Sequence, residues 1–361
     1  MNAALPLTRF RSDIQREIEA ALARQSRLLA PVGEETHRLV TALERLLEGG
    51  KRFRAAFCYW GYKAAGGTHD EAAVRLATSL EFFQAAALLH DDVMDDSAVR
   101  RGAPAAHVAF ATEHVEAGWE GSPERFGLSG AVLAGDLCLV ASDQVFAECG
   151  LPVHELGRAR PCFDEMRTQL MGGQLLEFVV SNRGWVNRST EERLELARKV
   201  VRFKSAKYSV EQPTLIGADA GGVSPTDRAL LSAYGLALGE AFQLRDDVLG
   251  VFGDPATTGK PAGDDLREGK HTVLLALTLD ACSADDAAHL LSLVGDRDAD
   301  DARIERARTI MTECGAVERH ETLIAEGAAA ARAALDATTG LTTEGAQALA
   351  SLIDLTTARD T

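Results

Sequence analysis

The chain has 361 residues and a formal net charge of -16, with 46% hydrophobic and 25% charged residues. So acidic a chain lacks the electropositive surface that nucleic-acid binding requires, which excludes that class of protein. No run approaches the roughly 18 apolar residues of a membrane span, and the first residues form no apolar secretion signal. We therefore expect a cytoplasmic protein with no integral membrane segment.

The six cysteines, at positions 58, 138, 149, 162, 282 and 314, show no C-x-x-C spacing. Neither a zinc site nor a thioredoxin-type motif is indicated. Scattered cysteines in a chain of this length are typical of reduced core residues.

Long stretches without proline occupy residues 32–103, 162–212 and 262–361. Helices can run unbroken through such stretches. We expect an N-terminal helical segment in residues 1–30. Thr68 with Glu71 then forms a capping-box pattern before a segment whose apolar residues recur with helical period.

Residues 114–130 are rich in glycine and predict a surface loop before a helix that starts near Ser129. Two more helix starts follow: one at Ser189, and one at Ser224, where Pro225 takes the favoured first position. Alternating strand patterns are hard to find, and no segment has the composition of an interdomain linker. The sequence therefore predicts an all-α protein with one domain over residues 1–361.

The first acidic cluster is HDDVMDD, residues 90–96. On a helix, Asp91 and Asp95 share one face, and Asp92 with Asp96 form a second pair beside them. The four carboxylates repel one another, and the C-terminal end of a helix disfavours anions. Bound divalent cations would remove both penalties, and oxygen ligands suit Mg²⁺. A solvated acidic turn is the alternative for this cluster alone.

A second acidic cluster, Asp246-Asp247, ends the apolar helix expected from Ser224. If the two helices lie side by side, two carboxylate clusters face each other across a cavity. Such a pair can hold several metal ions and, through them, a diphosphate. The second cluster therefore favours metal binding over a solvated turn.

Basic residues accompany both clusters. The segment GGKRFR, residues 49–54, offers three cations after a glycine pair, and Arg100-Arg101 follows the first cluster directly. Arginine binds phosphate through a bidentate fork, and lysine binds it as a point charge. Each basic residue alone is typical of a solvated surface. Their coincidence with two metal-type clusters indicates phosphate-bearing ligands.

Residues 49–275, with these motifs in this order and spacing, resemble the trans-isoprenyl diphosphate synthases, or polyprenyl synthetase family. The resemblance is strongest to the bacterial geranylgeranyl diphosphate synthase branch. It implies a helical bundle of the isoprenoid synthase type with a central prenyl-chain cavity. It also implies a homodimeric prenyltransferase that condenses isopentenyl diphosphate with dimethylallyl, geranyl or farnesyl diphosphate to a trans-polyprenyl diphosphate.

The resemblance assigns roles to matching residues. Mg²⁺, with three ions per active site, is expected on Asp91, Asp92, Asp95, Asp246 and Asp247. The isopentenyl diphosphate site is expected at Gly50, Lys51, Arg54, Gln84 and Arg101. The allylic diphosphate and the developing cation are expected at Arg100, Lys204, Ser205, Gln243, Lys260 and Lys270. The residues expected to act in catalysis are Lys204, Gln243, Asp91 and Asp246.

The second motif departs from the family pattern, because Gly250 stands where the full motif has a third Asp. This puts a secondary metal contact in doubt but leaves the primary ligand Asp246 in place. Asp254 is too far along the chain to replace it on the same helical face.

Product length follows from the small residues before the first cluster. Ala87 and Ala86 lie four and five residues before Asp91 and leave the path open where an aromatic residue would stop a C15 chain. Phe83, one turn deeper, is the predicted floor and gives C20 geranylgeranyl diphosphate as main product. Core packing is the alternative role for Phe83.

Other functions remain open at this stage. A farnesyl or longer-chain product is one of them. A class I terpene cyclase shares metal-triggered ionisation, but the Lys and Arg residues of the isopentenyl site would be unexplained. A non-catalytic regulatory subunit of a heteromeric synthase would tend to have lost the Asp-rich motifs, and both are present here.

Overall fold

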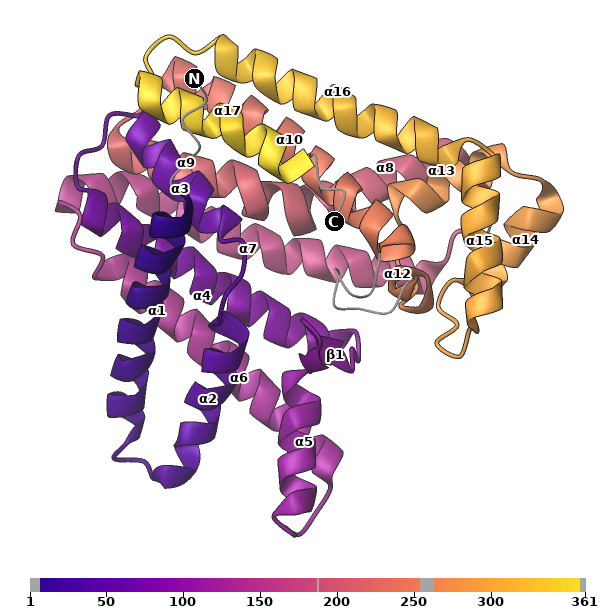
Figure 1. Ribbon diagram of the computed structural model, residues 1–361, viewed down its shortest axis with the longest axis horizontal. Helices are drawn as coiled ribbons and strands as arrows, with labels where there is room; N and C mark the ends of the chain where they lie inside the picture. The colour runs from indigo at the N-terminus through magenta and orange to yellow at the C-terminus, as the bar shows by residue number, and fades with distance from the viewer. Residues whose placement is uncertain (1–6, 187, 254–262, 358–361) are drawn as a thin grey trace. The chain divides into compact units, whose positions relative to one another are not determined.

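The computed structural model describes residues 7–186, 188–253 and 263–357 (Figure 1). The chain forms two compact units: unit 1 comprises Met1–Arg158 and Gly217–Gly222, and unit 2 comprises Ala159–Ile216 and Val223–Thr361. Helices make up nearly all regular structure among the described residues, so the predicted all-α class is confirmed. One domain over residues 1–361 stays a prediction.

Unit 1 is built from helices around α4, with one short hairpin. Its elements are α1 (Leu7–Leu29), η1 (Glu34–Thr36), α2 (His37–Leu47), α3 (Phe53–Ala64), α4 (Asp70–Met94), β1 (Val99–Arg100), β2 (Ala103–Pro104), α5 (Ala106–Glu116) and α6 (Pro123–Ala147). Helix α4 contacts α1, α2, α3, α5 and α6, which makes it the central element of the unit. Helix α1 lies within the predicted N-terminal helical segment.

Unit 2 is built around α10. Its elements are α8 (Thr190–Val200), η2 (Val201–Glu211), α10 (Pro225–Phe252), α12 (Asp264–Arg267), α13 (Val273–Ala281), α14 (Ala284–Leu293), α15 (Asp301–Glu313), α16 (Ala316–Asp336) and α17 (Thr343–Thr357). Helices α10, α16 and α17 run side by side (Figure 1). Two helices, α7 (Val153–Arg183) and α9 (Gln212–Gly221), contribute residues to both units.

The predicted helix starts at Ser189 and Ser224 are confirmed. Ser189 and Glu192 form a complete capping box, and the Ser224 hydroxyl accepts a hydrogen bond from the backbone of Asp227. The predicted capping box at Thr68 is wrong, because α4 begins one residue later with His69 as N-cap and no side-chain cap. The His69 backbone N–H instead donates to the Tyr62 hydroxyl at 3.1 Å, so a contact from α3 takes the place of the local cap.

The predicted loop over residues 114–130 is too long, because α5 ends at Glu116 and α6 begins at Pro123. Gly127 and Gly130 lie inside α6 and permit close packing against α5. A Cβ atom on Gly127 would lie 2.2 Å from the carbonyl oxygen of His107, and one on Gly130 would lie 2.7 Å from the Phe110 ring. These glycines therefore mark a helix contact rather than a loop.

Two helices among the described residues, α4 and α6, are long and apolar enough to cross a membrane by length and composition alone. In α4 the apolar stretch is 78% buried inside the protein, as expected for the core helix of a soluble fold, and in α6 it is 39% buried. The absence of an integral membrane segment stays a prediction. All six cysteines are free; four are buried as predicted for core residues, whereas Cys282 and Cys314 are half-buried.

Candidate active site

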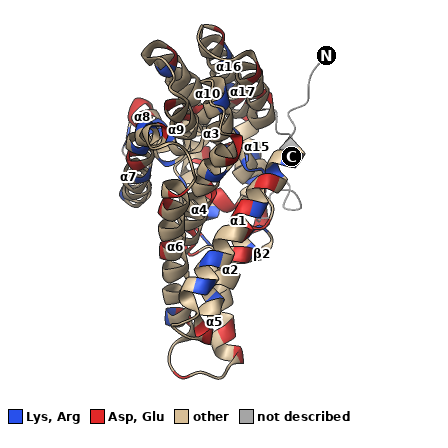
Figure 2. Cartoon of the chain, turned by 90° about the vertical axis from the view of Figure 1, so that its left-hand side faces the viewer, with Lys and Arg blue, Asp and Glu red and all other residues tan. Residues whose placement is uncertain are grey.

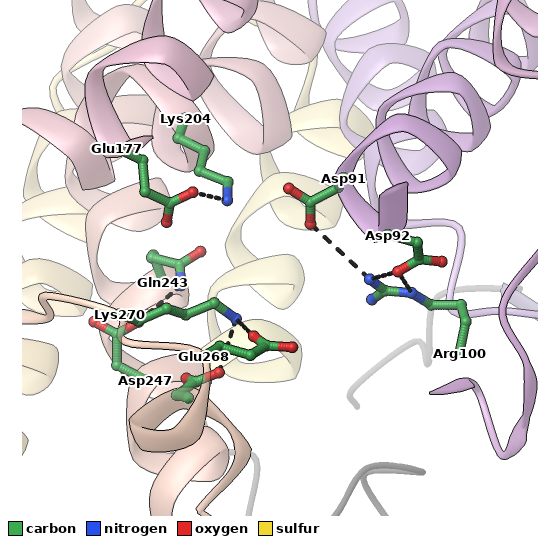
Figure 3. A network of polar contacts seen from close by, with 10 residues as sticks. Asp91, Asp92, Arg100, Glu177, Lys204, Gln243, Asp247, Glu268 and Lys270 are labelled. Atoms are coloured by element: carbon green, nitrogen blue, oxygen red, sulfur yellow. Dashed lines mark hydrogen bonds and ion pairs between the residues drawn. The ribbon is translucent and has the colours of Figure 1, made fainter. Parts of the chain in front are cut away.

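The first acidic cluster ends α4 in unit 1. Asp92 is 2% exposed, and its carboxylate accepts hydrogen bonds from Nε of Arg100, at 2.8 Å, and from a second guanidinium nitrogen (Figure 3). Asp91 is only partly buried and lies 3.9 Å from the same guanidinium. Asp95 caps the helix and is half-buried. The cluster thus divides into an inner carboxylate neutralised by Arg100 and outer carboxylates closer to solvent.

A two-residue hairpin places the arginine pair. Arg101 and Gly102, between β1 and β2, both have positive φ, at 53° and 74°, as type I′ hairpin turns require. The Arg101 guanidinium donates to the carbonyl oxygens of Leu46 and Glu48, at 2.8 and 3.3 Å. The hairpin therefore joins the end of the first acidic cluster to the segment that follows α2.

The glycine-rich segment 49–54 lies against this hairpin. Gly49 and Gly50 have φ values of 66° and 98°, and a Cβ on Gly50 would lie 3.5 Å from the Arg101 guanidinium. Lys51 is exposed and Arg54 is half-buried. Partial burial, together with the nearby positive charges of other arginines, lowers the pKa of Arg101. The predicted isopentenyl diphosphate residues Gly50 and Arg101 are thus brought together within unit 1.

Arg52 anchors this segment to neighbouring helices, a role that the sequence alone did not indicate. It adopts a left-handed conformation, with φ of 56°, and is 6% exposed. Its guanidinium donates to Glu81 of α4 at 2.8 Å, to Gln15 of α1 at 2.9 Å, and to the carbonyl oxygen of Leu47. The pair with Glu81 is buried on both sides. A non-glycine residue with positive φ before a helix is a signal that only the structure makes visible.

The predicted chain-length residues lie along α4. Phe83 and Ala86 are buried, each 1% exposed, and Ala87 and Gln84 are half-buried. Phe82, beside Phe83, is also buried. This arrangement fits a pocket floor at Phe83 and core packing equally, so the assignment stays a prediction.

The second acidic cluster lies on α10 in unit 2. The helix continues to Phe252, so Asp246 and Asp247 do not end it as predicted. Asp247 is 4% exposed and accepts a hydrogen bond from the Gln243 amide at 2.8 Å (Figure 3). Its second oxygen, Oδ2, is buried without a hydrogen-bond partner among the described residues. Burial, together with the charges of Asp265 and Asp246, raises the pKa of Asp247 well above its usual range.

Lys204 and Ser205 lie on η2, an 11-residue π-helix. π-Helical turns are rare and are frequent at functional sites. A Cβ on Gly173 of α7 would lie 2.7 Å from the backbone nitrogen of Lys204, and one on Gly239 of α10 would lie 2.6 Å from the carbonyl oxygen of Ala206. Two glycines therefore let the neighbouring helices approach the π-helix backbone at the predicted catalytic position.

Glu177 of α7 is a second residue that the sequence analysis missed. Its carboxylate accepts a hydrogen bond from the Lys204 ammonium group, and both side chains are more than four-fifths buried (Figure 3). The glycine pair Gly172-Gly173, inside the proline-free stretch 162–212, was the available signal, since glycine within a helix often marks close packing. Glu177 fixes where the Lys204 charge lies.

Lys270 follows α12 and is held by two carboxylates. Its ammonium group lies 2.8 Å from Asp265 and 2.7 Å from Glu268. Burial favours the neutral amine, but the two carboxylates outweigh it and hold the pKa of Lys270 well above its usual range. The remaining predicted contact, Lys260, lies outside the described residues.

To bind a metal ion, these clusters would need further ligands, such as phosphate oxygens of the substrate. No group of three or more His, Cys, Asp or Glu side chains in the described ranges is arranged to hold a metal ion. Mg²⁺ commonly uses one or two carboxylates together with phosphate oxygens and water. Within unit 2, the Oδ2 atom of Asp247, unpartnered among the described residues, suits coordination together with phosphate oxygens, and within unit 1 the outer carboxylates of the first cluster suit it likewise.

Three comparisons agree on the relationship. A crystal structure of a geranylgeranyl pyrophosphate synthase from Corynebacterium glutamicum, complexed with isoprenyl diphosphate and magnesium, superposes with a TM-score of 0.92 at 39% identity, covering 98% of this chain and 100% of that one. A geranylfarnesyl diphosphate synthase of Aeropyrum pernix is 31% identical over 284 residues, 78% of this chain and 81% of that protein. A geranylgeranyl diphosphate synthase of Sulfolobus acidocaldarius is 32% identical over 254 residues, covering 70% and 69%.

The all-α fold therefore places the protein among enzymes of the isoprenoid synthase type. The sequence model of the polyprenyl synthetase family matches residues 36–311. The chain belongs to the polyprenyl synthetase family, and it is a prenyltransferase.

Proposed function

We propose that the protein condenses isopentenyl diphosphate with an allylic diphosphate, in the presence of Mg²⁺, to give mainly the C20 product geranylgeranyl diphosphate. One observation carries the proposal: the sequence contains two Asp-rich clusters and the cations expected at two diphosphate sites, in the order and spacing of the family pattern. The related synthase of C. glutamicum, complexed with isoprenyl diphosphate and magnesium, supports the choice of ligands. Dimethylallyl, geranyl and farnesyl diphosphate are the candidate allylic substrates.

Asp91, Asp95 and Asp246 would hold the metal, with three ions per active site as the family pattern suggests. A bound Mg²⁺ supplies charge neutralisation for the departing diphosphate. Lys51, Arg54 and Arg101 bind isopentenyl diphosphate and fix its double bond for attack, and such positioning supplies much of the rate of a bimolecular step. Arg100, now paired with Asp92, is close enough to the first cluster to contact the allylic diphosphate.

In unit 2, Lys204 and Gln243 act on the developing allylic cation and its diphosphate. Glu177 fixes the ammonium group of Lys204, and Asp247 fixes the Gln243 amide so that its carbonyl oxygen stays available to a positive charge. The allylic carbon–oxygen bond breaks, releasing diphosphate, and the isopentenyl double bond then attacks the allylic cation to form the new carbon–carbon bond. A proton then leaves the condensation product to the released diphosphate, so no side-chain base is needed.

Incubation of the purified chain with isopentenyl diphosphate and each allylic diphosphate tests the proposal. Products are identified by mass spectrometry, with Mg²⁺ or with a chelator. We expect C20 product with Mg²⁺ and none with chelator, and Asp91→Asn should lower kcat by about 10²–10³-fold. No product from the chain alone would favour a regulatory subunit, and a cyclised hydrocarbon would favour a terpene cyclase.

Product length is tested at Phe83, with its buried neighbour Phe82 as matched control. Phe83→Ala should lengthen the main product beyond C20, because the floor of the pocket is removed. Phe82→Ala removes a ring of equal size from the adjacent position and should leave product length unchanged. Unchanged product length in Phe83→Ala would show that Phe83 only packs the core. The relatives named geranylgeranyl and geranylfarnesyl diphosphate synthase, at similar identity, show why this residue-level test is needed.

We also infer a cytoplasmic homodimer. On α6 the apolar side chains of Leu128, Val132, Leu133 and Val140 are 41 to 56% exposed. Leu128 and Val132 are about one helical turn apart, and Leu133 and Val140 are about two turns apart. An apolar stripe of this kind fits a second copy of the same helix better than water. Sedimentation analysis should show a dimer, and Leu133→Glu should shift it toward monomer. Acidic and basic residues are interspersed on α1 and α2 (Figure 2).

A further inference from the structure

We propose that Glu211 is a positioning residue for prenyl transfer: it holds the end of the π-helix η2 against α10 and so keeps Lys204 beside Glu177. The inference rests on the proposed function, in which Lys204 acts on the allylic substrate. All the residues that carry it, on α7, η2 and α10, belong to unit 2.

The first observation is the length of the π-helix. η2 spans the 11 residues Val201–Glu211, and the backbone N–H of Gln212 donates to the carbonyl oxygen of Lys207, five residues earlier. π-Helical hydrogen bonds are rare and mostly occur as single turns within α-helices. A π-helix of this length therefore needs support from the helices around it.

The second observation is the close approach of α10 to η2. A Cβ atom on Gly235 would lie 2.4 Å from Cα of Glu211, and one on Gly239 would lie 2.6 Å from the carbonyl oxygen of Ala206. The backbones of the two helices thus touch at the middle and at the last residue of η2. At such a distance, a side-chain contact made by Glu211 fixes the end of η2 on α10.

The third observation is the side chain of Glu211 itself, which is 5% exposed. Its Oε1 atom accepts a hydrogen bond from the Ser232 hydroxyl of α10 at 2.6 Å. Its Oε2 atom has no hydrogen-bond partner among the described residues and lies 3.6 Å from Nζ of Lys207. Apolar residues of similar volume are often as stable as a buried ion pair, or more so, and packing alone does not explain a carboxylate at this position.

Lys207 extends the contact to the other flanking helix. Its ammonium group lies 3.7 Å from Oε1 of Glu165 on α7, and 5.7 Å from the centre of the Phe203 ring. Glu211 is therefore joined to α10 through Ser232 and to α7 through Lys207. The last turn of η2 is tied to both helices that pack against it.

The register of η2 connects this anchor to Lys204. A hydrogen bond to the fifth residue back encloses one more residue than the α-helical bond to the fourth. Relaxation of η2 to an α-helix would consequently shift the residues before the changed turn by about one position relative to α7. Lys204 would then leave the carboxylate of Glu177, which now accepts its hydrogen bond. A displacement of about 1 Å is enough to lower a rate about 10²-fold.

Kinetics and hydrogen exchange of Glu211→Ala test the proposal. With isopentenyl and farnesyl diphosphate, kcat should fall by about 10- to 100-fold. KM for isopentenyl diphosphate should stay within about 3-fold, because the residues predicted to bind it, Lys51, Arg54 and Arg101, lie in unit 1. Hydrogen exchange followed by mass spectrometry should show amides of residues 201–211 exchanging at least about 10-fold faster than in the natural chain.

Three further variants separate anchoring from general stability. Tyr234→Phe removes another buried hydrogen bond of α10, from the Tyr234 hydroxyl to the Leu349 carbonyl oxygen at 2.8 Å, and should change neither kcat nor the exchange of η2. Lys207→Met/Glu211→Gln removes both charges but keeps an acceptor for the Ser232 hydroxyl, and should restore kcat to within about 3-fold of the natural value. Ser232→Ala should lower kcat by about 3- to 10-fold, and replaces Glu211→Ala if that variant does not fold.

The outcomes discriminate between the proposals. A kcat of Glu211→Ala within 3-fold of the natural value, or an equal loss in Tyr234→Phe, overturns the inference. A lowered kcat with unchanged exchange of residues 201–211 also overturns it, because Glu211 would then not act through η2. Absence of condensation by the natural chain is a different result, because it defeats the proposed function, and hydrogen exchange still reports whether Glu211 anchors η2.

Discussion

The buried carboxylates of Asp92 in unit 1 and Asp247 in unit 2 hold corresponding places in two acidic clusters, each the second of an Asp-Asp pair. Asp92 is met by the guanidinium of Arg100, a full positive charge. Asp247 is met by the neutral amide of Gln243, and its other oxygen is unpartnered among the described residues. The two motifs are similar in sequence, but the inner carboxylate has a charged partner in unit 1 and only a neutral one in unit 2.

The difference has a physical consequence for metal binding. A carboxylate already neutralised by arginine gains little from a cation, whereas one that is buried with a neutral partner gains much. If the clusters bind a cation as proposed, its affinity in unit 1 would reside in the outer carboxylates, Asp91 and Asp95. In unit 2 it would extend to the inner carboxylate, Asp247. The side chains that contact the two inner carboxylates differ as well, so each cluster can be tested by its own substitutions.

The largest expected effect concerns the buried ion pair between Arg52, in the basic segment 49–54 of unit 1, and Glu81. Glu81→Gln leaves the buried guanidinium of Arg52 without its counter-charge and should lower the free energy of unfolding by about 3–5 kcal/mol. Glu113→Gln is the control, since its pair with Arg38 is partly exposed and should cost about 0–1 kcal/mol. Urea denaturation measures both. Equal losses would show that Arg52 does not depend on Glu81.

Replacing each inner aspartate by asparagine tests the contrast between the two clusters most directly. Asp92→Asn should lower the free energy of unfolding by about 1.5–3 kcal/mol, because a charge-assisted hydrogen bond to Arg100 is lost. Asp247→Asn should raise it in buffer free of divalent cations, because the amide removes a buried carboxylate whose ionised form is disfavoured. Denaturation of both variants with EDTA present provides the test. Destabilisation by Asp247→Asn would contradict the contrast.

A smaller effect on stability is expected where Gly173 of α7 packs against the π-helix η2. Gly173→Ala places a methyl group 2.6 Å from the backbone carbon of Phe203 and 2.7 Å from the nitrogen of Lys204. Overpacking of this kind should cost about 1–3 kcal/mol, and kcat should fall because Lys204 moves. Gly172→Ala is the matched control, since no atom of the described residues outside its own helix lies within 4 Å of its added Cβ. Similar kinetics for the two variants would remove the link between this contact and Lys204.

The smallest effect concerns the start of α10, which carries the second cluster. Asp227 accepts hydrogen bonds from the Thr339 backbone N–H, at 2.9 Å, and from the Ser224 hydroxyl, and these bonds lower the pKa of Asp227. The stabilisation is therefore present above the unfolded pKa of about 3.9 and is lost as pH falls through the lower folded value. Asp227→Ala should cost about 1 kcal/mol at pH 7, and the difference should shrink in acid. A difference that does not change with pH would exclude this role.

Several features were determined by the sequence alone. The proline-free stretches and helical periods predict an all-α chain, because backbone geometry and apolar spacing are local properties. The caps at Ser189 and Ser224 follow from side chains within three residues. The Asp-rich and basic motifs identify the family, because their order along the chain carries the signal.

Other features were decided by tertiary structure. The start of α4 depends on Tyr62 from another helix, and Gly127 is helical because α5 packs against it. The partner of Lys204, the ion pair behind the basic segment and the Ser232 hydroxyl that contacts Glu211 come from residues far apart in sequence. Local patterns cannot show them, because burial and distance are set only when helices pack and exclude water. For this protein the sequence therefore determined which charged groups are present, and the packing of each unit decided which of them are neutralised.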